Sequence, residues 1–273
     1  RKMYEEYWGL KESPFENTPD PKFLYYSKEH EEGLSRLLYT LERRKGAALL
    51  TGVFGCGKTV LARAFLNKIN RNIYKVALIN NPYLKLVEFL RSIARQLGAE
   101  GLPEKLTEMS ADHFLQVIEG CLQNNAKDGR HTIVIIDEAH VITDNDIFEE
   151  LRLLLNFQAE DKFLITLILM GQPELADKIR KNKQFSQRIA LGYSLNPLTE
   201  GEMGNYISHR LKVAGVQKEI FLPKAMRPIF ENSGGIPRRI NQICDMCLMT
   251  GFSSQAKAID ETIVNEAVGS IGV

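Results

Sequence analysis

One stretch limits the fold of this chain more than any other: residues 52–59 read Gly-Val-Phe-Gly-Cys-Gly-Lys-Thr, the pattern G-x-x-x-x-G-K-T. Glycines let the backbone curl so that successive N–H groups point inward, where they can bind phosphate oxygens. An apolar run at 47–50 precedes the stretch, and a helix-like segment at 60–68 follows it. This strand–loop–helix order is the setting that a phosphate-binding loop requires. The sequence therefore predicts a nucleotide site on a strand–helix unit.

The residues of this loop have separate expected roles. Lys58 is expected to reach the β and γ phosphates, and the Thr59 hydroxyl to bind Mg²⁺. The N-terminus of the following helix adds its partial positive charge. The alternative is a glycine-rich turn that carries a lysine by chance. The predicted nucleotide contacts are Gly52, Val53, Phe54, Gly55, Cys56, Gly57, Lys58, Thr59 and Val60.

A second motif, Asp137-Glu138-Ala139-His140, closes a β-branched run at 132–136. A fully apolar run predicts a strand covered on both faces. Asp137 is expected to hold Mg²⁺ through water, opposite Thr59, and Glu138 to orient and polarise the water that attacks the γ-phosphate. Alone, such a pair is more often a surface feature; after a phosphate loop it predicts ATP hydrolysis. His140 is interpreted as a polar residue that flanks the site.

Two polar residues near the ends of later elements are weaker candidates. Gln172 follows the strand predicted at 163–170 and is a candidate sensor of the γ-phosphate, or else a turn residue before Pro173. Arg188 lies at the start of the fifth predicted strand. It could stabilise charge on the γ-phosphate of a neighbouring subunit, or be a solvated arginine at a helix end.

A pair of arginines opens a predicted helix near the C-terminus. Arg238 and Arg239 follow Pro237, which suits the first position of a helix. Cations at a helix N-terminus oppose its dipole, so an anion is expected to balance them. ATP phosphates are one candidate, with Pro237 as a further nucleotide contact. A structural carboxylate is the other.

Apolar runs alternate with helical patterns, which predicts a parallel five-stranded sheet with helices on both faces. The expected domains are an N-terminal arm at 1–26, a core at 27–197 and an all-α lid at 198–273. The arm is aromatic and proline-rich, so it is expected to be irregular and packed on the core. The expected strands are 47–51, 75–80, 132–136, 163–170 and 188–195. One expected helix starts at Ser27. The other expected helices span 59–69, 84–97, 111–124, 144–157, 199–214, 223–232, 237–250 and 260–268. A loop is expected at 98–107, and helix breaks are expected at Gly215, Gly234, Gly235 and Gly251.

Composition excludes some partners and leaves others. Lys and Arg number 35 and Asp and Glu 34, so no global field attracts nucleic acid or anionic lipid. The longest apolar run, 163–170, is far shorter than the roughly 20 residues of a membrane span. Cys244 and Cys247 are expected to be buried small hydrophobes rather than zinc or redox ligands, in a reducing cytoplasm.

These features together resemble the AAA+ ATPases and, more narrowly, the ExeA/GspA (general secretion pathway protein A) family of bacterial secretion ATPases. The phosphate loop and the acid pair carry the broader resemblance. Shorter stretches in the right order carry the narrower one. They are Tyr7-Trp8-Gly9-Leu10, Pro14-Phe15, Thr18-Pro19-Asp20-Pro21, Gly171-Gln172-Pro173-Glu174-Leu175, Gln187-Arg188-Ile189 and Gly234-Gly235-Ile236-Pro237-Arg238-Arg239-Ile240-Asn241.

The resemblance implies roles for the weaker candidates. Arg188 would be a finger that acts on a neighbouring subunit, so the chain would form a homo-oligomer. Gln172 would be the first sensor and Arg238 the lid sensor, with Arg239 as the alternative. The arm from Phe15 to Tyr26 would help to enclose the adenine.

The resemblance also implies a cellular role: coupling of Mg²⁺-dependent ATP hydrolysis to assembly of the secretin of type II secretion. In that family the ATPase is cytoplasmic and precedes a membrane span and a periplasmic domain, which we expect to lie beyond Val273 or to be absent. Phe54 and Cys56 depart from the usual loop sequence. The alternative is a DNA-binding ATPase that regulates transposition, for which 43–45 and 178–183 are candidate basic stripes.

Overall fold

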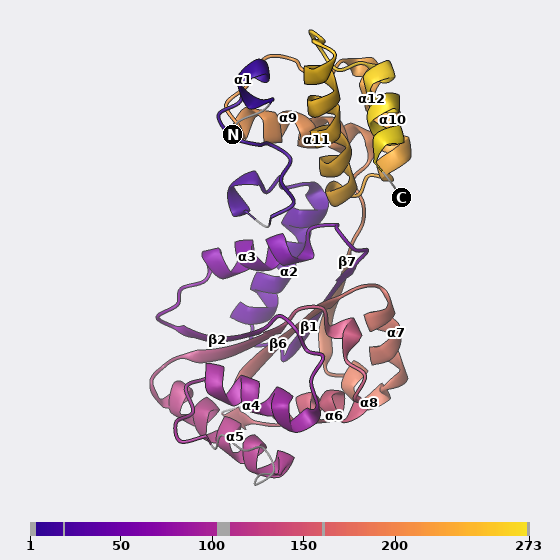
Figure 1. Ribbon diagram of the computed structural model, residues 1–273. Helices are drawn as coiled ribbons and strands as arrows, with labels where there is room; N and C mark the ends of the chain where they lie inside the picture. Colours follow the sequence, from indigo (N-terminus) through magenta and orange to yellow (C-terminus); the bar gives the residue numbers. More distant parts are fainter. Residues whose placement is uncertain (1–3, 19, 103–109, 160–161, 272–273) are drawn as a thin grey trace. The chain divides into compact units, whose positions relative to one another are not determined.

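The computed structural model describes residues 4–18, 20–102, 110–159 and 162–271, which form two compact units (Figure 1). Unit 1 comprises Arg1–Glu31, Val53–Leu61 and Asn196–Val273, and unit 2 comprises Glu32–Gly52 and Ala62–Leu195, each within the described residues. Residues 103–107 of the predicted loop at 98–107 lie outside the described residues. The three domain boundaries stay a prediction.

Unit 2 is built on a five-stranded parallel sheet in the order β2-β3-β6-β1-β7, which confirms the predicted fold class. β3 and β6 are buried along their whole length, as their largely apolar sequences predict. The strand bounds are β1 Ala47–Gly52, β2 Tyr74–Ile79, β3 His131–Ile136, β6 Ile165–Gly171 and β7 Ile189–Leu195.

Helices cover the sheet of unit 2 on both faces. In Figure 1, α4, α5 and α6 lie on one side of the sheet, and the parts of α2 and α3 that belong to this unit lie on the other. The core consists of apolar side chains at helical spacing, such as Phe89, Leu90 and Ile93 of α4, none of which is exposed. The bounds are α2 Lys28–Glu42, α3 Lys58–Lys68, α4 Leu86–Gln96, α5 Ala111–Lys127, η3 Ala139–Val141 and α6 Asn145–Leu154.

Two predictions about unit 2 were wrong. The run at 163–170 is not one strand, because β5 (Lys162–Phe163) pairs antiparallel with β4 (Gln158–Ala159) and only β6 joins the large sheet. The apolar pattern continues across this change of direction and so does not reveal it. Two helices, α7 (Glu174–Lys181) and α8 (Lys183–Ser186), were missed because they are short and mostly charged or polar.

Unit 1 gathers the C-terminal helices and the N-terminal arm around a second apolar core. The arm was expected to be irregular, but it contains one helical turn, α1, which ends at Gly9 with φ of +75°. Trp8 is 1% exposed, and its indole Nε1 donates to the carbonyl of Leu248 at 2.9 Å. The bounds are α1 Glu5–Trp8, η1 Pro21–Phe23, α9 Glu200–Val213, α10 Pro223–Ser233, α11 Pro237–Ser253 and α12 Glu261–Ser270.

Gly251 does not break α11, contrary to the prediction. The helix continues to Ser253, and a Cβ atom on Gly251 would lie 2.6 Å from Cδ1 of Ile259 and 2.8 Å from Cζ2 of Trp8. The glycine therefore permits close packing instead of ending the helix. Sequence alone cannot separate the two uses, because both need only the missing side chain.

Two of the expected helix starts have capping hydrogen bonds, and the expected burial of the cysteines is confirmed. Ser27 Oγ accepts the backbone N–H of His30 at 3.3 Å, and Thr199 forms a capping box with Glu202. Cys244 and Cys247 are not exposed, and burial raises the pKa of the Cys247 thiol to about 12. Among the described residues, no helix has both the length and the apolar character needed to cross a bilayer.

His131 at the start of β3 predicts acid sensitivity of unit 2. It is 3% exposed, its Nε2 contacts Thr166 Oγ1 at 2.8 Å, and burial lowers its pKa to about 4. Between pH 6.5 and 4 the unfolded chain binds a proton there that the folded chain does not, so stability should fall as the pH falls. We expect His131 to contribute a loss of about 3 kcal/mol over this range. Urea unfolding at several pH values should show that the free energy of unfolding depends less on pH in His131→Gln than in wild type. An equal pH dependence in the two proteins would contradict this contribution of His131.

Candidate functional site

The predicted phosphate loop follows β1 and leads into α3. Gly55 and Gly57 have φ of +85° and +101°, a region in which glycine has no steric cost. The backbone N–H of Cys56 donates to the carbonyl of Val53 at 3.3 Å, which closes a tight turn. The glycines of the motif therefore stand where the backbone needs them.

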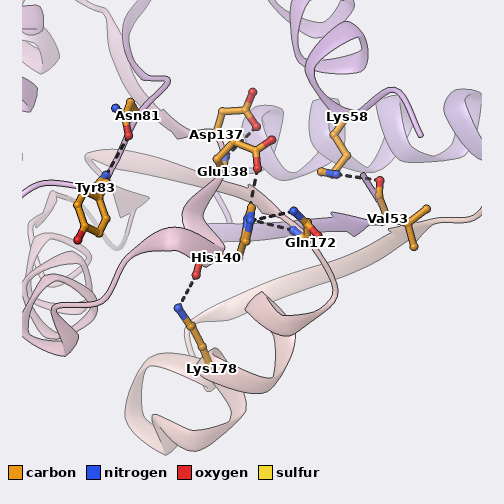
Figure 2. Close-up of polar contacts among 9 residues, drawn as sticks. All are labelled: Val53, Lys58, Asn81, Tyr83, Asp137, Glu138, His140, Gln172 and Lys178. Carbon is orange, nitrogen blue, oxygen red and sulfur yellow. Dashed lines mark hydrogen bonds and ion pairs between the residues drawn. The ribbon is translucent and has the colours of Figure 1, made fainter. Parts of the chain in front are cut away.

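Lys58 folds back over this loop. Its side chain is buried, and its Nζ donates to the carbonyl of Val53 at 3.2 Å (Figure 2). The next turn of α3 begins where the N–H of Leu61 donates to the carbonyl of Gly57 at 2.9 Å. This geometry holds a cation against the loop, as phosphate binding would require. The phosphate contacts of Lys58, Thr59 and Val60 stay predictions.

His30 of α2 also contacts the loop, and no sequence motif pointed to it. Its Nε2 lies 3.2 Å from the carbonyl oxygen of Cys56, and its Nδ1 lies 2.7 Å from Ser27 Oγ. The residue is 4% exposed, and burial lowers the pKa of its ring. The only sequence signal was the histidine in the first turn of an amphipathic helix, which is too common to be informative.

The start of α11 packs on the other side of the loop, within unit 1. The N–H of Arg238 donates to the carbonyl of Gly55 at 3.3 Å, and a Cβ atom on Gly55 would lie 2.7 Å from that of Arg238. The Arg238 guanidinium lies over the ring of Phe54, 4.6 Å from its centroid. Arg238 is therefore beside the loop, where a lid sensor is expected. Its role, and that of the neighbouring Pro237, stay predictions.

The residues expected to enclose adenine differ in exposure. Phe15 is 2% exposed and packs edge-on against Phe221, with 6.0 Å between ring centroids. Tyr26 is 41% exposed. Both belong to unit 1, as does the loop. Their contacts with a nucleotide stay predictions.

The acid pair lies at the end of β3, in unit 2. The N–H of Asp137 donates to the carbonyl of Ile79 at 2.8 Å, and its Oδ1 accepts the N–H of Glu138 at 2.9 Å. Asp137 is 5% exposed. Glu138 has φ of +53°, a left-handed conformation that costs a residue other than glycine about 1–2 kcal/mol. Such strain persists only where surrounding contacts hold it, and it often marks a functional residue.

His140 joins Glu138 to Gln172. Its Nδ1 lies 3.4 Å from Oε2 of Glu138, and its Nε2 lies 3.0 Å from the side-chain nitrogen of Gln172 (Figure 2). The backbone N–H of Gln172 also donates to Nδ1 at 3.4 Å, so His140 contacts Gln172 through both ring nitrogens. A Cβ atom on Gly171 would lie 3.2 Å from Nδ1, so the strand end leaves room for the ring.

Lys178 of α7 anchors the turn that carries His140. Its Nζ donates to the carbonyl of His140 and, at 2.9 Å, to that of Ile142 (Figure 2). The first of these carbonyls lies in the short η3 turn and the second just after it, where helix geometry leaves acceptors to be satisfied. Lys178 lies at one end of the candidate basic stripe at 178–183. Its ammonium group already donates to two carbonyls of its own chain, so it is not wholly available to bind an external anion.

Arg188 lies just before β7 and contacts its own subunit. One of its guanidinium nitrogens donates to Oδ1 of Asn156 at 3.1 Å. Arg188 is half-buried and Asn156 is exposed. A neutral exposed partner can be exchanged at little cost, so the contact is compatible with a finger that engages another subunit. That role stays a prediction.

The strand order brings the motif-bearing strand ends to one edge of the sheet. β6, which leads into Gln172, lies between β3, which leads into Asp137, and β1, which leads into Val53. Ligands of open parallel sheets bind beyond the carboxyl ends of the strands. The Asp137 carboxylate in unit 2 and the Thr59 hydroxyl in unit 1 are each hard oxygen groups, the ligand type that Mg²⁺ prefers, and their joint metal site stays a prediction.

Comparisons with known proteins agree with this geometry. A family model described as an AAA domain matches residues 41–179. General secretion pathway protein A of Aeromonas hydrophila is 37% identical over 258 residues, which cover 92% of this chain and 45% of that protein. This confirms the similarity expected from the motifs. An uncharacterized HTH-type transcriptional regulator of Methanocaldococcus jannaschii is 29% identical over 146 residues, which cover 52% of this chain and 35% of that protein. The chain thus spans less than half the length of either relative.

Two solved structures have the same fold. Cdc6p of Pyrobaculum aerophilum has a TM-score of 0.73 at 20% identity, covering 96% of this chain and 72% of its own. The ORC2 protein of Aeropyrum pernix, in ADPNP–ADP complexes, has a TM-score of 0.70 at 19% identity, covering 97% and 74%. At these identities the likeness shows the fold alone.

Proposed function

This chain belongs to the AAA domain family of P-loop ATPases, and we propose that it hydrolyses ATP with Mg²⁺ in an oligomer that drives assembly of a secretion complex. One observation carries the proposal. The G-x-x-x-x-G-K-T stretch forms a left-handed turn between a parallel strand and a helix, and its lysine folds over the turn. Similarity to general secretion pathway protein A supports the secretion role.

The proposed chemistry divides among four residues. Lys58 would neutralise charge on the β and γ phosphates, and the loop amides would bind their oxygens. Thr59 and Asp137 would hold Mg²⁺, which when bound would offset charge developing on the transferred phosphoryl group. Glu138 would orient the attacking water and polarise it as a general base. Each role uses the side-chain chemistry that its motif position predicts.

Gln172 is proposed to act on Glu138 through His140. The Gln172 amide contacts His140, and His140 contacts the Glu138 carboxylate, so loss of either link should loosen the same carboxylate. We expect Gln172→Ala and His140→Ala each to lower kcat about tenfold, and the double variant to lower it hardly further. Steady-state ATPase assays on the three proteins would measure this coupling. Multiplicative losses would contradict it.

Arg188 provides a test of oligomeric catalysis. If it acts on the site of a neighbour, Arg188→Ala should lower kcat about 10³-fold. A Lys58→Ala protein still carries Arg188 but lacks its own functional site. Mixing the two inactive variants should then restore turnover, because intact fingers meet intact sites at mixed interfaces.

The control for mixing is a single protein that carries both substitutions. It supplies neither an intact site nor an intact finger, so its mixture with either single variant should stay inactive. No recovery in the mixture of single variants would remove the proposed finger role of Arg188. A specific activity of the wild-type protein that does not change with protein concentration would argue against an oligomer.

The proposed cellular setting follows from the substrate and the relative. ATP is supplied in the cytoplasm, where we propose that this domain works. The proposed partners are proteins of the secretion apparatus, including the outer-membrane secretin. This chain matches 45% of the length of general secretion pathway protein A, so the relative's role does not transfer directly. The secretion role therefore needs a test in cells, for which a Glu138 variant is suited.

A further inference from the structure

We propose that His30 is a positioning residue that holds the phosphate loop in its binding conformation by hydrogen bonding to the Cys56 carbonyl. The inference rests on the proposed function, since it assigns His30 a part in binding the phosphates of ATP. His30 lies in the first turn of α2, and the loop follows β1, so the contact joins segments separated in sequence. Both segments belong to unit 1.

The hydrogen bonds around His30 determine which ring nitrogen carries the proton. Burial favours the neutral ring, which has one N–H donor. The Cys56 carbonyl can only accept, so Nε2 must be the donor in the 3.2 Å contact. Nδ1 is then the acceptor of a hydrogen bond that the Ser27 hydroxyl donates at 2.7 Å. Ser27 Oγ in turn accepts the backbone N–H of His30, which ties the ring to the helix start.

Peptide geometry turns this bond into control of a phosphate ligand. The carbonyl of Cys56 and the N–H of Gly57 belong to one planar trans peptide unit, so they point in opposite directions. Holding the carbonyl toward His30 therefore directs the Gly57 N–H away from it. In a phosphate-binding loop, the inward N–H groups are the ligands of the phosphate oxygens.

The loop needs such an anchor because glycine makes it easy to deform. Gly55 and Gly57 flank Cys56, and glycine reaches alternative backbone conformations at little cost. The His30 ring lies directly against the loop: a Cβ atom on Gly57 would be 2.9 Å from Nε2. The ring therefore restricts the loop by contact as well as by its hydrogen bond.

A matched pair of substitutions separates the hydrogen bond from simple filling of space. The side-chain nitrogen of glutamine is as many bonds from Cα as histidine Nε2, whereas that of asparagine corresponds to Nδ1. His30→Gln can therefore keep the bond to Cys56, and His30→Asn can reach only toward Ser27. Binding of mant-ATP with Mg²⁺ should weaken about tenfold in His30→Asn and stay within about threefold of wild type in His30→Gln.

The kinetic pattern provides a second readout. Because His30 would position a binding group, the KM for ATP should rise in His30→Asn while kcat at saturation changes less than about twofold. His131→Gln, which alters a buried histidine at the opposite end of β3 from the acid pair, is the matched control and should leave mant-ATP affinity unchanged. A merely destabilising effect would lower the affinity of His131→Gln and His30→Asn alike.

The outcomes separate this inference from the proposed function. If wild-type protein does not bind mant-ATP, the proposed function fails. If wild type binds and His30→Asn binds equally well, or His30→Gln is as weak as His30→Asn, only the role of His30 fails. If a variant does not fold, ¹⁵N NMR of the wild-type ring decides: a proton on Nε2 supports the inference, and a proton on Nδ1 alone overturns it.

Discussion

Lys58→Ala is expected to weaken Mg·ATP binding about 30- to 100-fold and to remove measurable turnover. The buried ammonium group is held over the loop by its bond to the Val53 carbonyl, so it would meet phosphate with little further ordering. A charge-assisted hydrogen bond of this kind contributes about 1.5–3 kcal/mol. Titration with a fluorescent ATP analogue, together with a thermal melt of each protein, measures the loss.

The same helix provides the control for this prediction. Lys68 is exposed in the last turn of α3, and Lys68→Ala removes an equal charge at a distance from the loop. We expect its affinity to match wild type. Undiminished nucleotide binding by a folded Lys58→Ala protein would contradict the phosphate role of the loop, and the mechanism built on it would have to be abandoned.

Glu138→Gln is expected to lower kcat by about 10²–10³ while ATP still binds. Glutamine keeps the size of glutamate and can still contact His140, but it cannot serve as a base for the attacking water. The backbone N–H of this residue, at φ of +53°, donates to Oδ1 of Asp137, a contact that does not use the Glu138 carboxylate. Single-turnover hydrolysis and ATP titration on the same preparation separate the chemical step from binding.

A matched control and a test in cells complete this prediction. Glu174→Gln changes an exposed glutamate in the first turn of α7 and should leave kcat unaltered. In cells, a protein that binds ATP without turnover should stop formation of the multimeric outer-membrane secretin. Normal secretin multimers in Glu138→Gln cells, with hydrolysis abolished, would exclude a turnover-driven secretion role but not the ATPase assignment.

Local patterns in the sequence were sufficient for the sheet core. The alternation of apolar runs and helical spacing predicts a parallel sheet, because such strands are buried on both faces and need crossover helices. The motif at 52–59 predicted a curled loop, and the structure has Gly55 and Gly57 at positive φ there. Both properties depend on residues close together in the chain.

Short or direction-changing segments could not be predicted in the same way. The run at 163–170, which covers Phe163 of β5 and most of β6, is almost entirely apolar, so the end of the hairpin looks like part of the strand. Gly251 reads as a helix end, but its missing side chain accommodates Trp8 and Ile259. In each case the deciding contact comes from residues distant in sequence.

The sequence by itself determined the fold class and the candidate chemistry of the loop and the acid pair, because those depend on periodicity and on residue types at fixed spacing. Only the tertiary structure decided which side chains support them. His30 reaches the loop from another helix, and His140 links Gln172 to Glu138 across two strand ends. Such partners follow from how the chain returns on itself, since hydrogen bonds and packing act over a few ångströms in space regardless of separation along the chain.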